Sequence, residues 1–165
     1  MSVEMQPGSF ELEYSHFEVD PGLDDFQVPV EASLTYALHG YRLIATCGHG
    51  PDAPVRPVRL SLGGDVQQLG AEGYRLTVSR EEVELTAPTA VGLLYGIETL
   101  SQLVQQPSEP FLSAWLPCVE IVDRPRFAWR GQLLDVSRHF LPIDVVRRNI
   151  DRLAELKMNV FHWHL

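Results

Sequence analysis

A strand–helix–strand pattern in the last part of the chain restricts the fold more than any other feature of the sequence. Residues 127–136 (FAWRGQLLDV) and 158–165 (MNVFHWHL) are apolar segments that predict strands. Between them, Pro142 and Asp144 begin a predicted helix, with Asp144 suited to the positive end of the helix dipole. Two strands joined by one helix over about 40 residues run parallel. Parallel strands are normally buried on both faces, so this pattern predicts a larger sheet than one such unit supplies.

Residues 56–119 predict a different class of domain. A strand is expected at residues 58–62, and two later segments, Tyr74–Val78 and Val83–Ala87, alternate apolar and polar residues as half-buried strands do. A polar turn joins these two segments into a predicted hairpin. The helical spacing of apolar residues then predicts a helix from about Pro88 to Gln105. We therefore expect an α+β domain, an antiparallel sheet with a helix on one face.

Gly92 and Gly96 lie four residues apart within this predicted helix. They leave one flank of the helix without side chains, although each glycine costs roughly 1 kcal/mol of helix propensity. We expect that flank to lie close against the sheet.

The first 55 residues predict no clear element. Prolines and glycines interrupt residues 1–30, which we expect to be irregular: Pro7, Gly8, Pro21, Gly22 and Pro29. Two short strands are expected afterwards, at residues 33–38 and 41–45. The predicted organisation is an unassigned region at 1–55, the α+β domain at 56–119, and a third unit at 120–165.

Composition excludes several classes of function. The net charge is -9 and no cluster of lysine and arginine is present, so nucleic acid is not an expected partner. No apolar run approaches the roughly 18–20 residues that cross a bilayer, so no membrane partner is expected. Cys47 and Cys118 form no CxxC pattern, which favours free thiols in a reducing compartment. The N-terminus has no basic or apolar region typical of a secretory signal, so the cytoplasm is the default location.

A long string of residues at fixed spacing carries a resemblance to a known family. It consists of Arg130-Gly131, residues 134–140 (LDVSRHF), Pro142 and residues 157–165 (KMNVFHWHL). Together with residues 91–103 (VGLLYGIETLSQL), this string resembles the β-N-acetylhexosaminidases of glycoside hydrolase family 20. The resemblance implies an α+β accessory domain followed by the first β-α-β of a (β/α)8 TIM barrel, truncated after its second strand.

The resemblance also implies a reaction. The family removes terminal N-acetylglucosamine or N-acetylgalactosamine from the non-reducing end of glycans by a retaining, substrate-assisted mechanism. Its Asp–Glu pair orients the acetamido group and protonates the leaving group, and this pair falls on the fourth barrel strand, beyond Leu165. We therefore expect no catalytic residue within this chain, no activity from the chain alone and no cofactor. A secreted parent enzyme is the alternative to a cytoplasmic one.

Arg138 is the one substrate-binding residue that the resemblance places in the chain. It matches the arginine that hydrogen-bonds the C3 and C4 hydroxyls of the terminal sugar. Its expected position agrees, because barrel active sites gather at the carboxyl ends of strands and a guanidinium offers donors in a fixed fork. For Asp135 and His139 we expect structural or packing roles, and for Arg130 a stabilising role at the opposite end of the strand.

His162 and His164 share one face of the last predicted strand, because side chains alternate along a strand. An HxH pattern is also one way in which barrel hydrolases hold zinc, so a metal-dependent hydrolase is an alternative. No third ligand at a suitable spacing is visible in the sequence. We therefore expect no metal, and a structural role for both histidines in a polar network beneath the sugar pocket.

The expected partner is a glycan that ends in an N-acetylhexosamine. A non-catalytic carbohydrate-binding or interaction module is a further alternative. Self-association through exposed barrel strands is also expected, because unpaired strand edges invite pairing with other chains.

Overall fold

The computed structural model describes residues 1–12, 15–20, 22–23, 30, 56–105 and 114–165. The chain divides into two compact units, Met1–Arg124 and Pro125–Leu165. The division therefore lies after strand β6 (Trp115–Asp123), and the boundary predicted at residue 120 falls inside that strand. The strands expected at 33–38 and 41–45, and the residue Cys47, lie outside the described residues.

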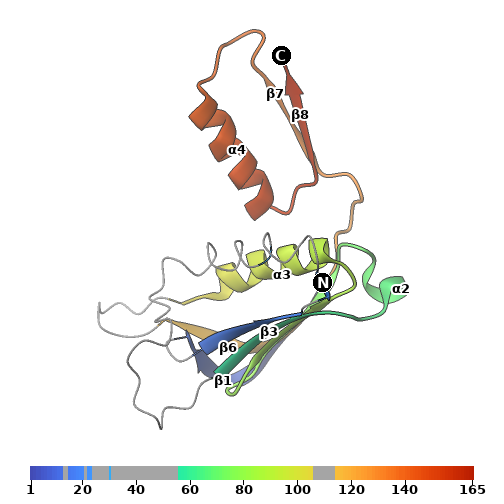
Figure 1. Ribbon diagram of the computed structural model, residues 1–165, viewed down its shortest axis with the longest axis vertical. Coiled ribbons are helices and arrows are strands. Elements are labelled where there is room, and N and C mark those ends of the chain that lie inside the picture. The colour runs from blue at the N-terminus through green and yellow to red at the C-terminus, as the bar shows by residue number, and fades with distance from the viewer. Residues whose placement is uncertain (13–14, 21, 24–29, 31–55, 106–113) are drawn as a thin grey trace. The chain divides into compact units, whose positions relative to one another are not determined.

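The first unit is built on a six-stranded sheet with the order β1-β6-β4-β5-β3-β2 (Figure 1). Its other strands are β1 (Ser2–Glu11), β2 (Ser15–Val19), β3 (Arg56–Leu62), β4 (Tyr74–Val78) and β5 (Val83–Ala87). The predicted hairpin is confirmed as β4 and β5. The sheet is mixed, however, because β3 pairs parallel with both β2 and β5. The prediction of an antiparallel sheet was wrong here, since helix α2 (Val66–Leu69) and β4 carry the chain from β3 to β5 and return it in the same direction.

The strands β1 and β2 correct the expectation that residues 1–30 are irregular. β1 is an edge strand, where proline is tolerated, and its register against β6 shifts between Met5 and Ser9. Gly8 in this bulge has a φ of +124°, which residues with a side chain rarely adopt. Pro7 and Gly8 therefore mark a bulge within a strand and not a break between elements.

Helix α3 (Ala90–Leu103) covers one face of the sheet over β3, β4 and β5 (Figure 1). The helix begins later than predicted, because Thr89 caps it by accepting a hydrogen bond from the amide of Gly92, and Pro88 precedes the cap. The glycines lie against the sheet as expected: a Cβ on Gly96 would overlap the side chain of Leu85.

The core of the first unit lies between α3 and the sheet. Its sheet side is formed by alternate residues of the strands, and its helix side by residues at helical spacing. The most buried members include Leu60, Leu76, Leu85, Leu93, Ile97 and Leu100. Cys118 of β6 is also buried, as a free thiol.

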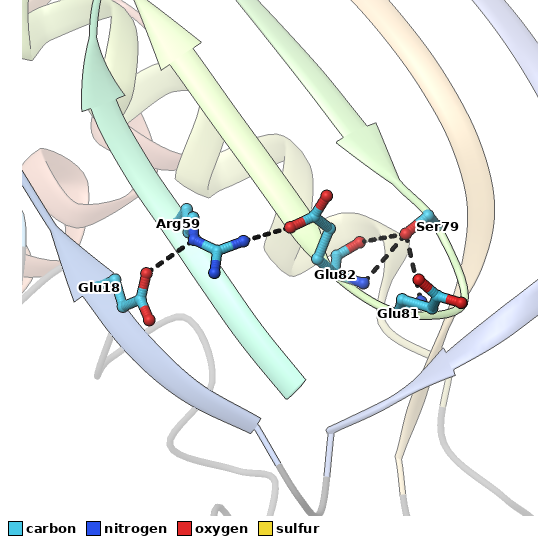
Figure 2. A network of polar contacts seen from close by, with 5 residues as sticks. All are labelled: Glu18, Arg59, Ser79, Glu81 and Glu82. Atoms are coloured by element: carbon cyan, nitrogen blue, oxygen red, sulfur yellow. Dashed lines mark hydrogen bonds and ion pairs between the residues drawn. The ribbon is translucent and has the colours of Figure 1, made fainter. Parts of the chain in front are cut away.

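The opposite face of the sheet carries charged side chains. Figure 2 shows Arg59 of β3 between Glu18 of β2 and Glu82 at the turn before β5. The Nε atom of Arg59 lies 2.7 Å from Glu18 Oε2. The hydroxyl of Ser79 closes the β4–β5 turn, because it donates to the carbonyl of Glu82 at 2.9 Å and accepts from that residue's amide at 3.0 Å. These ion pairs are solvent-exposed, so each contributes little to the stability of the fold.

The second unit is the predicted β-α-β. Strands β7 (Gly131–Asp135) and β8 (Val160–His164) pair parallel, and helix α4 (Ile143–Glu155) connects them (Figure 1). β7 is shorter than the predicted strand, and its residue Leu133 is 58% exposed. One helix can cover only one face of a two-stranded sheet, so apolar residues on the other face have no cover within this unit.

No helix among the described residues is both long enough and apolar enough to cross a membrane.

Candidate functional site

The carboxyl ends of β7 and β8 bring three of the predicted site residues together. Asp135 ends β7, and His164 stands opposite it in the register, at the end of β8. Arg138 follows β7 in the next turn. Because the two strands are parallel, their carboxyl ends meet at one edge, which is where barrel enzymes bind their substrates.

Asp135 gathers most of the polar contacts at this edge. Its Oδ1 atom accepts hydrogen bonds from the Ser137 amide at 3.0 Å, the Ser137 hydroxyl at 2.8 Å and the Arg138 amide at 3.3 Å. His164 Nδ1 lies 3.2 Å from the same oxygen. Asp135 therefore closes the turn after its own strand and ties that turn to the neighbouring strand.

The same contacts change the acidity of Asp135. The hydrogen bond from the Ser137 hydroxyl, and after it the Arg138 amide and His164, hold the pKa of the Asp135 carboxyl below its ordinary value. The ionised form is therefore the one that these donors stabilise at neutral pH.

Arg138 contacts Asp135 through both its backbone and its side chain. Its Nε atom lies 3.4 Å from Asp135 Oδ2, and its side chain is 86% exposed. No other hydrogen bond or ion pair joins its guanidinium to the part of the chain that the structure describes. The Nη1 and Nη2 atoms therefore have no protein partner there, and their N–H groups are available to a ligand.

The Asp135–Ser137–His164 set is not the triad of a serine hydrolase. In that triad, one ring nitrogen of the histidine contacts the aspartate and the other contacts the serine. Here Nδ1 of His164 faces both Asp135 Oδ1, at 3.2 Å, and Ser137 Oγ, at 3.3 Å. The serine proton is also engaged by the carboxylate. The set therefore orders the turn and does not generate a nucleophile.

His139 and His162 lie outside this cluster. Both are exposed, and neither side chain makes a hydrogen bond or ion pair with any described residue. The polar network expected for the HxH pattern thus includes His164 alone. Across the described ranges, no group of three or more His, Cys, Asp or Glu side chains is placed to hold a metal ion.

Arg130 and Asn159 join the amino-terminal ends of β7 and β8, opposite the carboxyl edge described above. Arg130 Nε donates to the Lys157 carbonyl at 2.8 Å, and its Nη1 donates to the Phe127 carbonyl at 2.6 Å. The side chain of Asn159 accepts from the Arg130 amide at 3.0 Å and donates to the Ala128 carbonyl at 2.8 Å. These are the contacts of a stabilising residue, as the sequence predicted for Arg130.

Sequence reasoning missed two residues of this unit, Ser137 and Asn159. Ser137 was detectable, because a serine two positions after an aspartate is typical of a turn closed by the carboxylate. No local sequence pattern indicates the role of Asn159, because its partners Arg130 and Ala128 lie about 30 residues earlier, just before β7.

A parallel β-α-β with polar residues at its carboxyl edge, preceded by a sheet with a helix on one face, is consistent with an α+β domain followed by the start of a β/α barrel. Comparison with protein families agrees with this division. Residues 1–124 match the family model "Glycosyl hydrolase family 20, domain 2", and residues 127–165 match the model of that family's catalytic domain. The chain belongs to glycoside hydrolase family 20.

Similar proteins come from bacteria, plants and mammals. Beta-hexosaminidase 3 of Arabidopsis thaliana is 37% identical over 144 residues, which cover 80% of this chain and 26% of that protein. The beta-hexosaminidase of Porphyromonas gingivalis is 43% identical over 101 residues, which cover 59% of this chain and 13% of that protein. The chain thus spans about a quarter of the length of the first of these relatives and less of the second.

Solved structures of the family have a similar fold. The GH20 β-N-acetylhexosaminidase of Streptomyces coelicolor matches with a TM-score of 0.77 at 36% identity, over 99% of this chain and 33% of that one. The exo β-N-acetylglucosaminidase of Vibrio harveyi, solved in complex with N-acetylglucosamine, matches with a TM-score of 0.79 at 28% identity, over 99% of this chain and 24% of that one.

Proposed function

We propose that these residues form the front part of a retaining, substrate-assisted β-N-acetylhexosaminidase, which removes terminal N-acetylglucosamine or N-acetylgalactosamine from glycans. Membership of family 20 and the names of the similar proteins support a glycosidase of this kind. The N-acetylglucosamine held by the similar Vibrio harveyi enzyme supports the class of sugar.

The observation that carries the proposal is the state of Arg138. It follows the carboxyl end of β7, its Nε atom is engaged by Asp135, and the N–H groups of its Nη atoms have no partner among the residues described. Two neighbouring hydroxyls of a sugar, such as those on C3 and C4, are acceptors at a spacing that this fork of donors suits. Arg138 then fixes the orientation of the terminal sugar in the site, so that its C1 and acetamido group face the residues that act on them.

The remaining chemical steps are assigned to residues outside this chain. In the proposed mechanism the acetamido oxygen attacks C1, an aspartate orients the acetamido group, and a glutamate protonates the leaving oxygen. Within the proposal, Arg138 binds and orients the sugar without exchanging a proton with it.

We also propose that the chain alone self-associates, because Leu133, Phe140 and Trp163 of the second unit are exposed.

The test of Arg138 uses a longer protein in which these residues continue through the rest of the barrel. Arg138→Ala is expected to lower kcat/KM for a chromogenic N-acetylglucosaminide on the order of 100-fold, because two hydrogen bonds from a charged donor are lost at about 1.5 kcal/mol each. The control is Arg147→Ala, since Arg147 lies on α4 and is also exposed, with an ion pair to Asp144. Unchanged kinetics for Arg138→Ala would remove this residue from the sugar site.

A further inference from the structure

We propose that Asp135 is a positioning residue for Arg138, and that His164 holds Asp135 in place from the neighbouring strand. This inference rests on the proposed function, because it concerns the arginine assigned there to the sugar. It goes beyond that function by naming the residues that orient the guanidinium of Arg138.

The two oxygens of Asp135 have separate tasks. Oδ1 accepts from the amides of Ser137 and Arg138, at 3.0 and 3.3 Å, and so fixes the backbone of the turn. Oδ2 lies 3.4 Å from Arg138 Nε and so restrains the side chain. One carboxylate therefore holds Arg138 at two points, its amide and its Nε atom.

The use of Nε decides which donors remain for a ligand. A guanidinium has five N–H groups, one on Nε and four on the two Nη atoms. With Nε engaged by Asp135, the four Nη donors are left for neighbouring hydroxyl oxygens. An exposed arginine without such a restraint samples many rotamers, and the loss of this freedom weakens binding. Asp135 removes part of that freedom before the sugar arrives.

His164 restrains Asp135 from the side of β8. The two residues are opposite each other in the parallel register, and the carbonyl of His164 accepts from the Val136 amide at 3.0 Å. The ring Nδ1 atom lies 3.2 Å from Asp135 Oδ1. Because Oδ1 is an acceptor, His164 donates from Nδ1. The His164 ring therefore links the turn that holds Arg138 to strand β8.

Asp135→Asn separates the two tasks of the carboxylate. The amide oxygen of an asparagine still accepts from the Ser137 and Arg138 amides, so the turn is retained. Its NH2 group, however, presents a donor where Oδ2 faced the Nε donor of Arg138, and the side-chain restraint is lost. A matched control is Asp144→Asn, which removes an ion pair of the same i,i+3 spacing, from Asp144 to Arg147, on α4.

The restraint is measured directly on the 165-residue chain by ¹⁵N NMR of the arginine Nε–H groups. Exchange of the Arg138 Nε–H with water is expected to be severalfold slower than that of Arg147. In the Asp135→Asn variant, the Nε–H exchange rate of Arg138 is expected to rise to that of Arg147. In the Asp144→Asn variant, the Nε–H exchange rate of Arg138 is expected to stay unchanged. Equal Arg138 exchange in the wild-type chain and in Asp135→Asn would overturn the positioning role.

The consequence for the sugar is measured in the longer protein with a double-mutant cycle. Asp135→Asn is expected to raise KM about tenfold and to change kcat by less than about twofold. The reason is that Arg138 would bind the sugar equally in the ground state and in the transition state, so weaker binding affects KM and not kcat. In an Arg138→Ala background, Asp135→Asn should have no further effect. An equal loss in both backgrounds would show that Asp135 acts independently of Arg138 and would overturn the inference.

The two experiments also separate this inference from the proposed function. If Arg138→Ala leaves kcat/KM unchanged while the NMR restraint is observed, the sugar-binding role fails and the restraint on Arg138 stands. If Arg138→Ala lowers kcat/KM while the restraint is absent, the sugar-binding role stands and the role of Asp135 is overturned.

Discussion

At the scale of single residues, Tyr74 joins three elements of the first unit. It is 1% exposed, and its hydroxyl lies 2.5 Å from Thr99 Oγ1 of α3 and donates to Asp123 Oδ2 of β6 at 3.1 Å. Burial raises the pKa of the Tyr74 hydroxyl well above its ordinary value, and the nearby Asp123 charge raises it further. Tyr74 therefore remains neutral in the folded state at a pH at which an exposed tyrosine ionises.

Tyr74→Phe tests this arrangement through the free energy of unfolding. At pH 7 the variant is expected to be less stable by about 1–2 kcal/mol, because Thr99 and Asp123 each lose a hydrogen-bond partner. A raised folded-state pKa adds stability below the unfolded-state pKa of about 10 and loses it as pH rises above that value. The difference between wild type and variant should therefore narrow above about pH 10 in urea unfolding. A difference that stays constant with pH would contradict this account of Tyr74.

At the scale of elements, the two units differ in how much apolar surface they bury. The first unit has a core shared by α3 and the sheet. In the second unit, all of whose residues are described, the buried hydrophobic residues are Val146 and Leu153 of α4. The β7–β8 pair is therefore expected to open more readily than the central strands of the first unit.

Amide hydrogen exchange measures this difference within one sample. Backbone amides in β4 and β5 are expected to exchange at least about 100-fold more slowly than those of β7 and β8, which corresponds to about 3 kcal/mol in opening free energy. The central strands serve as the internal reference. Protection of β8 equal to that of β4 would show that the β-α-β unit is held by interactions that its burial does not reveal.

Local patterns in the sequence predicted the elements whose partners are close along the chain. The β4–β5 hairpin, α3, α4 and the parallel β7–β8 pair belong to this group, because periodicity and short connections report on them directly. β1 and β2 were missed, since their partners, β6 and β3, lie far along the chain and their prolines and glycines resemble loop signals. The parallel pairing of β3 with β5 was missed because the hairpin pattern of β4 and β5 does not report which strand pairs with the other edge of β5.

The candidate site was predictable to a similar extent. The positions of Asp135 and Arg138 at a strand end followed from the strand pattern. The pairing of Asp135 with His164 depends on the register of β7 and β8, which no local pattern reports. His139 and His162 were grouped with them by sequence, but the structure gives neither a contact to the cluster.

At the scale of the whole molecule, the chain spans 13% to 26% of the length of the two hexosaminidase relatives compared with it, and Arg138 is the residue within it that is proposed to bind the sugar. Sugar binding and bond cleavage fall to different residues in the proposed function. In the proposed function, Arg138 orients the terminal sugar, whereas attack on C1 and protonation of the leaving group require residues that this chain is proposed to lack.

Hydrolysis of a chromogenic N-acetylglucosaminide, measured for the purified 165-residue chain beside a protein that continues through the rest of the barrel, tests this claim most directly. We expect release by the longer protein and, for the 165-residue chain, no release above a buffer blank. Turnover by a clean preparation of the 165-residue chain would contradict it, as would an inactive longer protein that is shown to be folded.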